Sequence, residues 1–207
     1  MASRRPRKTG PSPAHILDDV KKGVICPLYY LFGEEDFLRD QLLHTLTDAV
    51  IEPATRDFNL DTYTADDIEI SHAISQILTF PMMAERRMVV LKHADHLSDA
   101  DPRELLPIIE SPPETTVLVI TANKPDGRKK LFSELRKRAI AVEFRTPYDN
   151  EIPAWIQTRV KILGRQIEPK AAHQLQMSVG SNLRELNTEI EKLFIATDAD
   201  LITHQHV

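Results

Sequence analysis

The feature of this chain that most restricts its fold is a regular alternation of short apolar runs and longer amphipathic stretches. Runs rich in apolar or β-branched residues lie at 28–32, 57–63, 88–92, 116–121 and 140–144. Amphipathic stretches of helical length separate them, near 36–50, 67–78, 102–110 and 128–138. This alternation is typical of a parallel sheet whose faces are covered by crossover helices. Because 88–91 and 117–120 are continuously apolar, we expect them to form central strands buried on both faces.

The pattern changes after Pro147, where three helical segments follow and no further strand is recognised. The first extends over about 149–163 and ends at Gly164, and the second begins at 169 and ends near Gly180. The third begins at Asn182, a suitable N-cap residue, and carries one apolar stripe. This stripe consists of Leu183, Leu186, Ile190, Leu193 and Phe194.

The two ends of the chain differ in character from the regions between them. Residues 1–12 are basic and rich in Pro, Gly and Ser, so we expect a disordered leader, for which simple solvation is favoured over DNA binding. Ser12 and Pro13 then offer a cap and a first-turn proline for a short helix that ends before Gly23. Residues 201–207 resemble the cap and first turn of an uncompleted helix, so we expect the sequence to end near a domain junction. The predicted parts are a tail (1–12), an α/β domain (13–147) and a small three-helix domain (148–207).

An acidic turn follows the first apolar run, at the place where a nucleotide-binding α/β protein carries its phosphate loop. The turn reads Gly33, Glu34, Glu35 and Asp36, in place of several glycines and a lysine. Because phosphate binding needs backbone N–H donors and a cation, three carboxylates would repel it. A paired-carboxylate or cation site is an alternative, but we favour an acidic first helical turn that complements the helix dipole. The sequence therefore predicts an inactive nucleotide site and no bound cofactor.

Composition indicates an ordinary globular chain with an acidic body. Hydrophobic residues make up 42% and charged residues 28%, and no run approaches the roughly 18 apolar residues of a membrane span. The single Cys26 rules out an internal disulfide framework, and a cytoplasmic location is the default expectation. Four of the 26 bases lie in residues 1–12, which contain no acids. The rest of the chain therefore has 22 bases against 31 acids, a net charge of −9. Such a body is a poor general binder of nucleic acid.

Two further clusters are candidates for sites. His93, Asp95 and His96 follow the third run, where a nucleotide hydrolase would hold magnesium, but they lack a supporting ligand elsewhere. We therefore favour a solvated loop, with no catalytic residue and no metal. The segment 124–138 has seven bases against two acids and is a candidate contact for DNA or for an acidic subunit, although a solvated helix face is equally consistent. The bases singled out are Lys124, Arg128, Lys129 and Lys130.

The segment after the second predicted crossover helix combines a proline with three large, soft apolar side chains. Phe80 and the pair Met82 and Met83 flank Pro81 before the next strand begins. Packing beneath the sheet is one explanation. A plug for the apolar pocket of another protein is the other, because methionine adapts its shape and aromatic residues anchor interfaces. The residues alone leave both explanations open.

The order of these segments resembles the delta subunit family of the bacterial DNA polymerase III clamp loader. Each motif is short, but their joint order covers nearly everything from residue 27 onward. The matching motifs are 30–35 with Phe37-Leu38, 57–61, 78–91 with Pro81 and 85–87, 94–97, 112–113 with 116–119, 129–131, 153–156, and 179–180 with 182–184.

The resemblance implies an AAA+-like fold that does not hydrolyse nucleotide. It also implies that Phe80, Met82 and Met83 form a hydrophobic plug that binds the ring-shaped sliding clamp, beta, and favours its opening. This chain has two methionines where relatives usually have Leu or Phe. The implied partners are the gamma/tau and delta prime subunits, which the family contacts through a helical collar domain expected to begin where this sequence stops. Primed DNA would be bound indirectly, and no membrane contact is expected. The chain would be a non-catalytic subunit of a DNA-directed DNA polymerase (nucleotidyltransferase) holoenzyme, in the cytoplasm at replication forks of the nucleoid.

Two other functions remain open on the residues themselves. A degenerate nucleotide-binding ATPase of the same fold would still bind ATP through backbone groups, and the acidic turn argues against it. A nucleic-acid-binding module based on 124–138 would have an affinity for DNA that falls steeply with salt.

Overall fold

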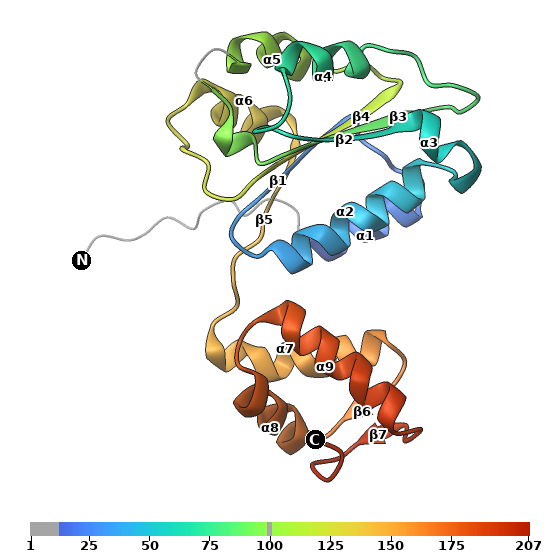
Figure 1. The fold of residues 1–207 in the computed structure, drawn as a ribbon, viewed down its shortest axis with the longest axis vertical. Coiled ribbons are helices and arrows are strands. Elements are labelled where there is room, and N and C mark those ends of the chain that lie inside the picture. Colours follow the sequence, from blue (N-terminus) through green and yellow to red (C-terminus); the bar gives the residue numbers. More distant parts are fainter. Residues whose placement is uncertain (1–12, 99–100) are drawn as a thin grey trace. The chain divides into compact units, whose positions relative to one another are not determined.

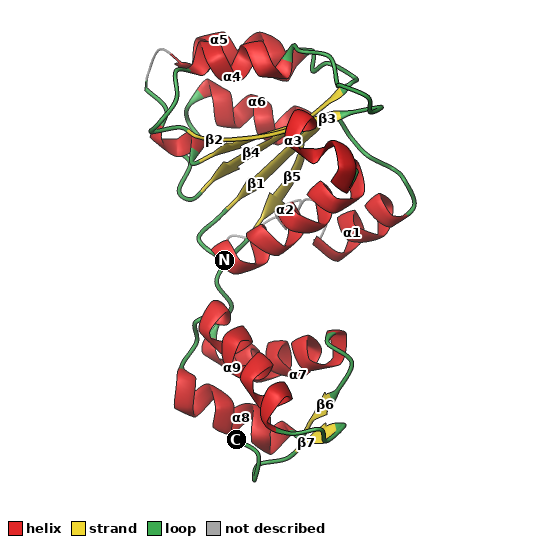
Figure 2. Ribbon diagram, turned by 45° about the vertical axis from the view of Figure 1, so that its right-hand side comes forward, coloured by secondary structure: helices red, strands yellow, loops and turns green. Residues whose placement is uncertain are grey.

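The computed structural model describes residues 13–98 and 101–207 of the chain. These residues divide into two compact units, with the boundary between Arg145 and Thr146. The first unit contains a parallel sheet and its helices, and the second is mainly helical. Figure 2 distinguishes the strands from the helices in each unit. The predicted leader, 1–12, and the proposed cap Ser12 lie outside the described residues.

Five parallel strands form the sheet of the first unit, in the order β2-β3-β4-β1-β5. Figure 1 shows helices on both faces of this sheet. The predicted central runs became β3 and β4, and both are buried almost throughout, as is β1. The strands are β1 (Leu28–Phe32), β2 (Leu60–Thr64), β3 (Arg87–Lys92), β4 (Thr116–Ala122) and β5 (Ile140–Glu143).

The sheet separates two apolar layers. One layer packs α4 (Ile70–Ile77), α5 (Asp101–Glu110) and α6 (Lys130–Arg138) on one face, and the other packs α1 (Pro13–Lys21) and α2 (Asp36–Val50) on the opposite face. Successive residues of β1 alternate between the layers: Tyr30 joins the first layer and Leu31 the second, and neither is exposed. Burial on both faces explains why the central runs are apolar without alternation.

The second predicted strand begins later than the sequence indicates. Residues 56–59 form a short helix, α3 (Arg56–Asn59), which follows a 3₁₀ turn at Pro53–Thr55, and only then does β2 begin. The prediction that the strand starts at residue 57 was therefore wrong. The side-chain amide of Asn59 donates a hydrogen bond to the carbonyl oxygen of Thr55 at 3.1 Å, so a local contact supports the helical turn.

Three helices form most of the second unit, close to the predicted positions. They are α7 (Ile152–Ile162), α8 (Pro169–Val179) and α9 (Leu183–Ala196), and a 3₁₀ turn at Asp149–Glu151 precedes α7. Asn182 caps α9 as predicted, because its Oδ1 accepts the N–H groups of Arg184 and Glu185 at 3.0 and 3.2 Å. Gly164 has φ +91°, which suits the end of a helix.

Two short strands in the second unit were not predicted. β6 (Gln166–Ile167) pairs in parallel with β7 (Leu201–Ile202), and Ile202 is fully buried. The expectation that 201–207 begins a helix was therefore wrong. The backbone N–H groups of Gln166 and Glu168 donate to the carbonyl oxygens of Asp200 and Ile202 at 2.8 and 2.9 Å, so pairing with β6 satisfies the backbone here in place of a helix. Within the described residues, no helix is both long and apolar enough to cross a membrane.

Candidate functional site

The candidate residues of the first unit lie at two opposite edges of the sheet: the edge formed by the carboxyl ends of the strands and the edge formed by their amino ends. The acidic turn, His93, Asp95 and Lys124 follow the carboxyl ends of β1, β3 and β4. The loop with Phe80, Met82 and Met83 precedes the amino end of β3. Because β3 has six residues at roughly 3.3 Å per residue, the two edges are separated by about 20 Å. They therefore form two separate sites.

The acidic turn is a tight, self-capped connection between β1 and α2. Oε1 of Glu35 accepts the N–H of Phe37 at 3.1 Å, so Glu35 is the N-cap of α2. The backbone N–H of Glu35 donates to the carbonyl oxygen of Phe144 at 3.2 Å. Gly33 has φ +123°, and a Cβ atom there would lie 2.0 Å from the same oxygen. The glycine is therefore needed for close backbone approach, and the carboxylates complement the helix dipole, as favoured from the sequence.

Two cationic side chains at this end of the sheet are held by contacts within the molecule. Nζ of Lys124 lies 3.0 Å from Oε1 of Glu34. The guanidinium of Arg39, which is only 5% exposed, donates to the carbonyl oxygen of Gly33 at 3.0 Å and to Oδ1 of Asn123 at 2.6 Å. These contacts tie the turn after β1 to the segment after β4.

Asp95 binds the backbone N–H groups that follow β4. Its Oδ1 accepts from Asn123 at 3.0 Å and its Oδ2 from Lys124 at 2.9 Å. Burial acts to raise the pKa of Asp95, but the N–H groups of Lys124 and Asn123 outweigh it, so the pKa lies below its ordinary value. A protein carboxylate thus occupies two donors of the kind that an anionic ligand would use.

The two histidines near Asp95 are also engaged. The rings of His93 and His96 stack with centroids 5.5 Å apart, and Nδ1 of His96 lies 2.7 Å from Oδ2 of Asp66. The hydrogen bond and the charge of Asp66 raise the pKa of His96. Among the described residues, no group of three or more His, Cys, Asp or Glu side chains is arranged to hold a metal ion.

The four bases singled out from the sequence are all exposed. Lys124 pairs with Glu34, and Arg128 pairs with Asp126 at 2.8 Å. Lys129 and Lys130 lie at the N-cap and first residue of α6. The charges of Lys124 and Arg128 are therefore balanced within the molecule.

The apolar loop, residues 78–86 between α4 and β3, exposes its large side chains. Phe80 is 79% exposed, Met82 54% and Met83 89%, so packing beneath the sheet, one of the two explanations offered by the sequence, does not apply. The loop projects from the amino edge of the sheet beside α3 (Figure 1). Side chains of this size are normally buried, and an exposed apolar cluster commonly marks an interface.

Buried polar contacts hold the start of the apolar loop on the sheet. Oγ1 of Thr116 donates to the carbonyl oxygen of Ile77 at 2.8 Å. The guanidinium of Arg87, 3% exposed, is hydrogen-bonded and ion-paired to Asp61, and it also donates to Oε1 of Gln76 at 3.2 Å and to the carbonyl oxygen of Thr79 at 3.4 Å. The exposed side chains therefore rest on an anchored frame.

Two further exposed apolar residues, one at the start of this loop and one beside it, were not singled out from the sequence. Leu78 is 56% exposed at the end of α4, and Phe58 is 61% exposed in α3. Asn59, which follows Phe58, forms hydrogen bonds with the backbone of Met82, so α3 adjoins the apolar loop. Phe58 was assigned to a strand, and no local signal in the sequence identifies it as a neighbour of residue 82.

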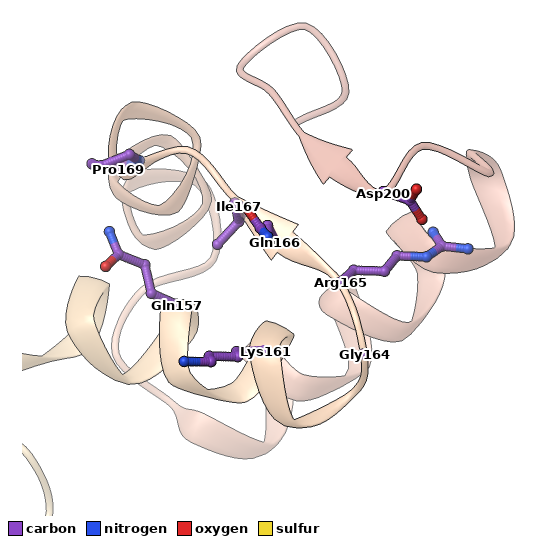
Figure 3. A pocket seen from close by; sticks show the side chains of 8 residues that line it. All are labelled: Gln157, Lys161, Gly164, Arg165, Gln166, Ile167, Pro169 and Asp200. Carbon is purple, nitrogen blue, oxygen red and sulfur yellow. The ribbon is translucent and has the colours of Figure 1, made fainter.

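The second unit contains a pocket next to the β6–β7 pair (Figure 3). Its lining residues are Gln157, Lys161, Gly164, Arg165, Gln166, Ile167, Pro169 and Asp200. Arg165 is committed to internal contacts, because its guanidinium lies 4.4 Å from the ring centroid of Phe194 and donates to the carbonyl oxygen of Thr197 at 2.6 Å. This arginine therefore ties the end of α9 to the turn after α7.

Comparisons with known proteins agree on one family. The family model described as DNA polymerase III, delta subunit, matches residues 29–145. The DNA polymerase III subunit delta of Bacillus subtilis is 32% identical over an alignment of 188 residues, which covers 86% of this chain and 54% of that protein. The solved structure of the Bacillus subtilis DNA clamp loader delta protein has a TM-score of 0.77 and 29% identity, covering 94% of this chain and 61% of the other.

A more distant likeness concerns the fold alone. The RuvB Holliday junction branch migration motor of Thermotoga maritima has a TM-score of 0.56 and 15% identity, covering 94% of this chain and 65% of that one. The sheet therefore has the parallel arrangement expected from the alternating pattern and the AAA+-like architecture that the family resemblance implied. The chain spans about half the length of the curated relative that it matches.

Proposed function

The chain belongs to the DNA polymerase III delta subunit family, and on that premise we propose that it binds the sliding clamp through the apolar loop and favours opening of the ring. The same premise makes it a component of the clamp loader in DNA replication. Because the chain spans only part of its curated relative, contacts made by the remaining length belong to the same proposal.

One observation carries the proposal: three large apolar side chains are exposed on a loop whose start is anchored by buried polar contacts. Each side chain of this kind gains roughly 1.5 to 3 kcal/mol when it is fully buried. Phe80 supplies a rigid aromatic anchor, and Met82 and Met83 adapt to the shape of a pocket. The acidic body argues for a hydrophobic contact with a protein rather than for a phosphate backbone.

In the proposed mechanism, the loop acts as a wedge. Binding free energy from the buried apolar side chains offsets part of the free energy needed to separate one interface of the ring. A ligand shifts such an equilibrium only as far as it binds the open form more tightly than the closed form. The ATP cycle of the partner subunits gamma/tau, assembled with delta prime through the collar domain, would determine when the loop is accessible.

The carboxyl edge of the sheet supports the non-catalytic part of the proposal. Carboxylates stand where a phosphate loop would be, and Asp95 occupies the N–H groups of Asn123 and Lys124. The carboxylates at this edge would repel a triphosphate, and few backbone N–H groups remain free to bind one. We infer that the chain does not hydrolyse ATP and acts within the polymerase holoenzyme by binding.

The basic residues have a secondary role in this proposal. Lys124, Arg128, Lys129 and Lys130 would contact a neighbouring acidic subunit or primed DNA. Because Lys124 and Arg128 are paired within the molecule, the isolated chain should bind DNA weakly.

The experiment that tests the proposal is a titration of the sliding clamp from the same organism with the chain and with a variant in which Phe80, Met82 and Met83 are replaced by alanine. We expect clamp binding by the chain and much weaker binding by the variant. Equal affinities would refute the proposal.

A further inference from the structure

The apolar loop has a backbone conformation that needs support. Met83 has φ +54°, in the left-handed region that side chains other than glycine rarely adopt. Its side chain is 89% exposed and so gains little from packing within the chain. A strained residue persists only where its surroundings fix the backbone on either side, and such residues gather at functional sites.

The side chain of Asn59 supplies that support, because it binds the backbone of Met82, the residue before Met83. Its Nδ2 donates to the carbonyl oxygen of Met82 at 2.8 Å, and its Oδ1 accepts the N–H of Met82 at 2.7 Å. One amide thus satisfies both backbone polar groups of Met82, in a pairing that also fixes which end of the amide is nitrogen. Asn59 is fully buried, although the Met82 side chain is 54% exposed.

The contact joins parts of the chain that are 23 residues apart. Asn59 is itself fixed, because Nδ2 also donates to the carbonyl oxygen of Thr55 and β2 begins at the next residue. The loop is therefore held at two points, at Thr79 by Arg87 and at Met82 by Asn59. Between and just beyond these points lie the exposed side chains of Phe80, Met82 and Met83.

We propose that Asn59 is a positioning residue for clamp binding, which pre-orders the apolar loop so that Met82 and Met83 project in the conformation that the partner binds. This inference rests on the proposed function of the loop. Pre-ordering raises affinity because a loop that is already fixed loses less conformational entropy on binding. Without the amide, Met83 should relax out of the left-handed region, and the loop should sample many conformations.

The first test needs no partner. In the free chain, hydrogen exchange at the Met82 amide, followed by NMR, should be slow although the side chain is exposed. In Asn59→Ala it should become about tenfold faster or more, while the amides of Val90 and Leu118 in the sheet stay protected. If Asn59→Ala folds poorly, Asn59→Leu serves in its place, because it keeps a side chain of similar size and removes both hydrogen bonds to the Met82 backbone. Fast Met82 exchange in the unchanged chain would overturn the inference.

The second test is a cycle of clamp titrations on the full chain. Asn59→Ala should weaken clamp binding by about tenfold. When Phe80, Met82 and Met83 are already alanine, it should cause no further loss, because there is no apolar loop left to position. Val142→Ala, a core truncation on the far edge strand β5, controls for general destabilisation and should leave clamp affinity unchanged.

The outcomes separate the inference from the proposed function. If the variant with alanine at positions 80, 82 and 83 loses affinity for the clamp and Asn59→Ala does not, the positioning role is wrong and the clamp site stands. If Asn59→Ala weakens binding equally with and without the apolar side chains, Asn59 acts structurally and the inference fails. If the variant with alanine at positions 80, 82 and 83 binds the clamp as tightly as the unchanged chain, both the clamp site and the positioning role are wrong.

Discussion

The carboxylate of Asp95 accepts the backbone N–H of Lys124 at 2.9 Å, beyond the carboxyl ends of the strands, where open parallel α/β sheets in general bind their ligands. Its second oxygen accepts the N–H of Asn123 at 3.0 Å. Lys124 in turn pairs with Glu34 in the turn after β1. The segments that follow β1, β3 and β4 are thus joined by one ion pair and two hydrogen bonds.

The first prediction concerns nucleotide binding. Because three carboxylates replace the phosphate loop and Asp95 occupies neighbouring donors, the chain should not bind ATP. Isothermal titration with ATP and Mg²⁺ should give no heat of binding, corresponding to a Kd weaker than about 1 mM. Micromolar affinity would instead favour the degenerate ATPase.

The second prediction concerns acid stability. Because the folded-state pKa of Asp95 is lowered, its stabilising contribution is present above the ordinary aspartate pKa and is lost as pH falls through the folded value. Asp95→Asn should therefore lower the free energy of unfolding at pH 7 by about 1 to 2 kcal/mol and make it less sensitive to acid. Urea unfolding at pH 7 and pH 3 measures both effects. The exposed Asp57→Asn is the matched control, and equal behaviour of the two variants would contradict the prediction.

The third prediction concerns the buried arginine beneath the apolar loop. Arg87→Met leaves the carboxylate of Asp61 without its ion-pair partner and removes the donor to Thr79, so the free energy of unfolding should fall by about 2 to 4 kcal/mol. Adding Asp61→Asn should recover part of the loss, because no unpaired charge remains. Urea unfolding of the single and double variants decides the point, and a double variant less stable than Arg87→Met would count against the ion-pair explanation.

The fourth prediction extends the clamp contact to α3. Phe58 is exposed next to the residue that holds Met82, so Phe58→Ala should weaken clamp binding by about 1 to 2 kcal/mol without lowering the melting temperature. Surface plasmon resonance with immobilised clamp measures the affinity. Unchanged binding would restrict the contact to the apolar loop.

The sheet and most helices were predictable because their signals are local. Residues 88–91 and 117–120 are apolar at every position, and such short runs rich in β-branched residues are typical of strands buried on both faces. The cap at Asn182 and the turn at Gly164 follow from single-residue preferences in the same way. Exposure of Phe80, Met82 and Met83 could not be decided locally, since the same composition suits a core.

The features that were missed depend on contacts distant in sequence. The β6–β7 pair joins residues 35 positions apart through two residues each, too few to show a period. Residues 57–59 look like a strand, but they form a helical turn in which Asn59 reaches both Thr55 and Met82. A hydrogen bond across 23 residues leaves no periodic trace, so the support of the apolar loop becomes visible only in the fold.

The most direct measurement of the central claim is the affinity for the sliding clamp of the same organism, determined by titration with purified chain and with the Phe80→Ala, Met82→Ala, Met83→Ala variant. Met177→Ala in the second unit is the matched control, because that methionine is 83% exposed and lies outside the apolar loop. The account predicts that the loop variant loses about 2 to 4 kcal/mol, or about 30- to 1,000-fold in Kd, while the control binds normally. A loop variant that binds the clamp as tightly as the unchanged chain, with its circular dichroism intact, would contradict the account.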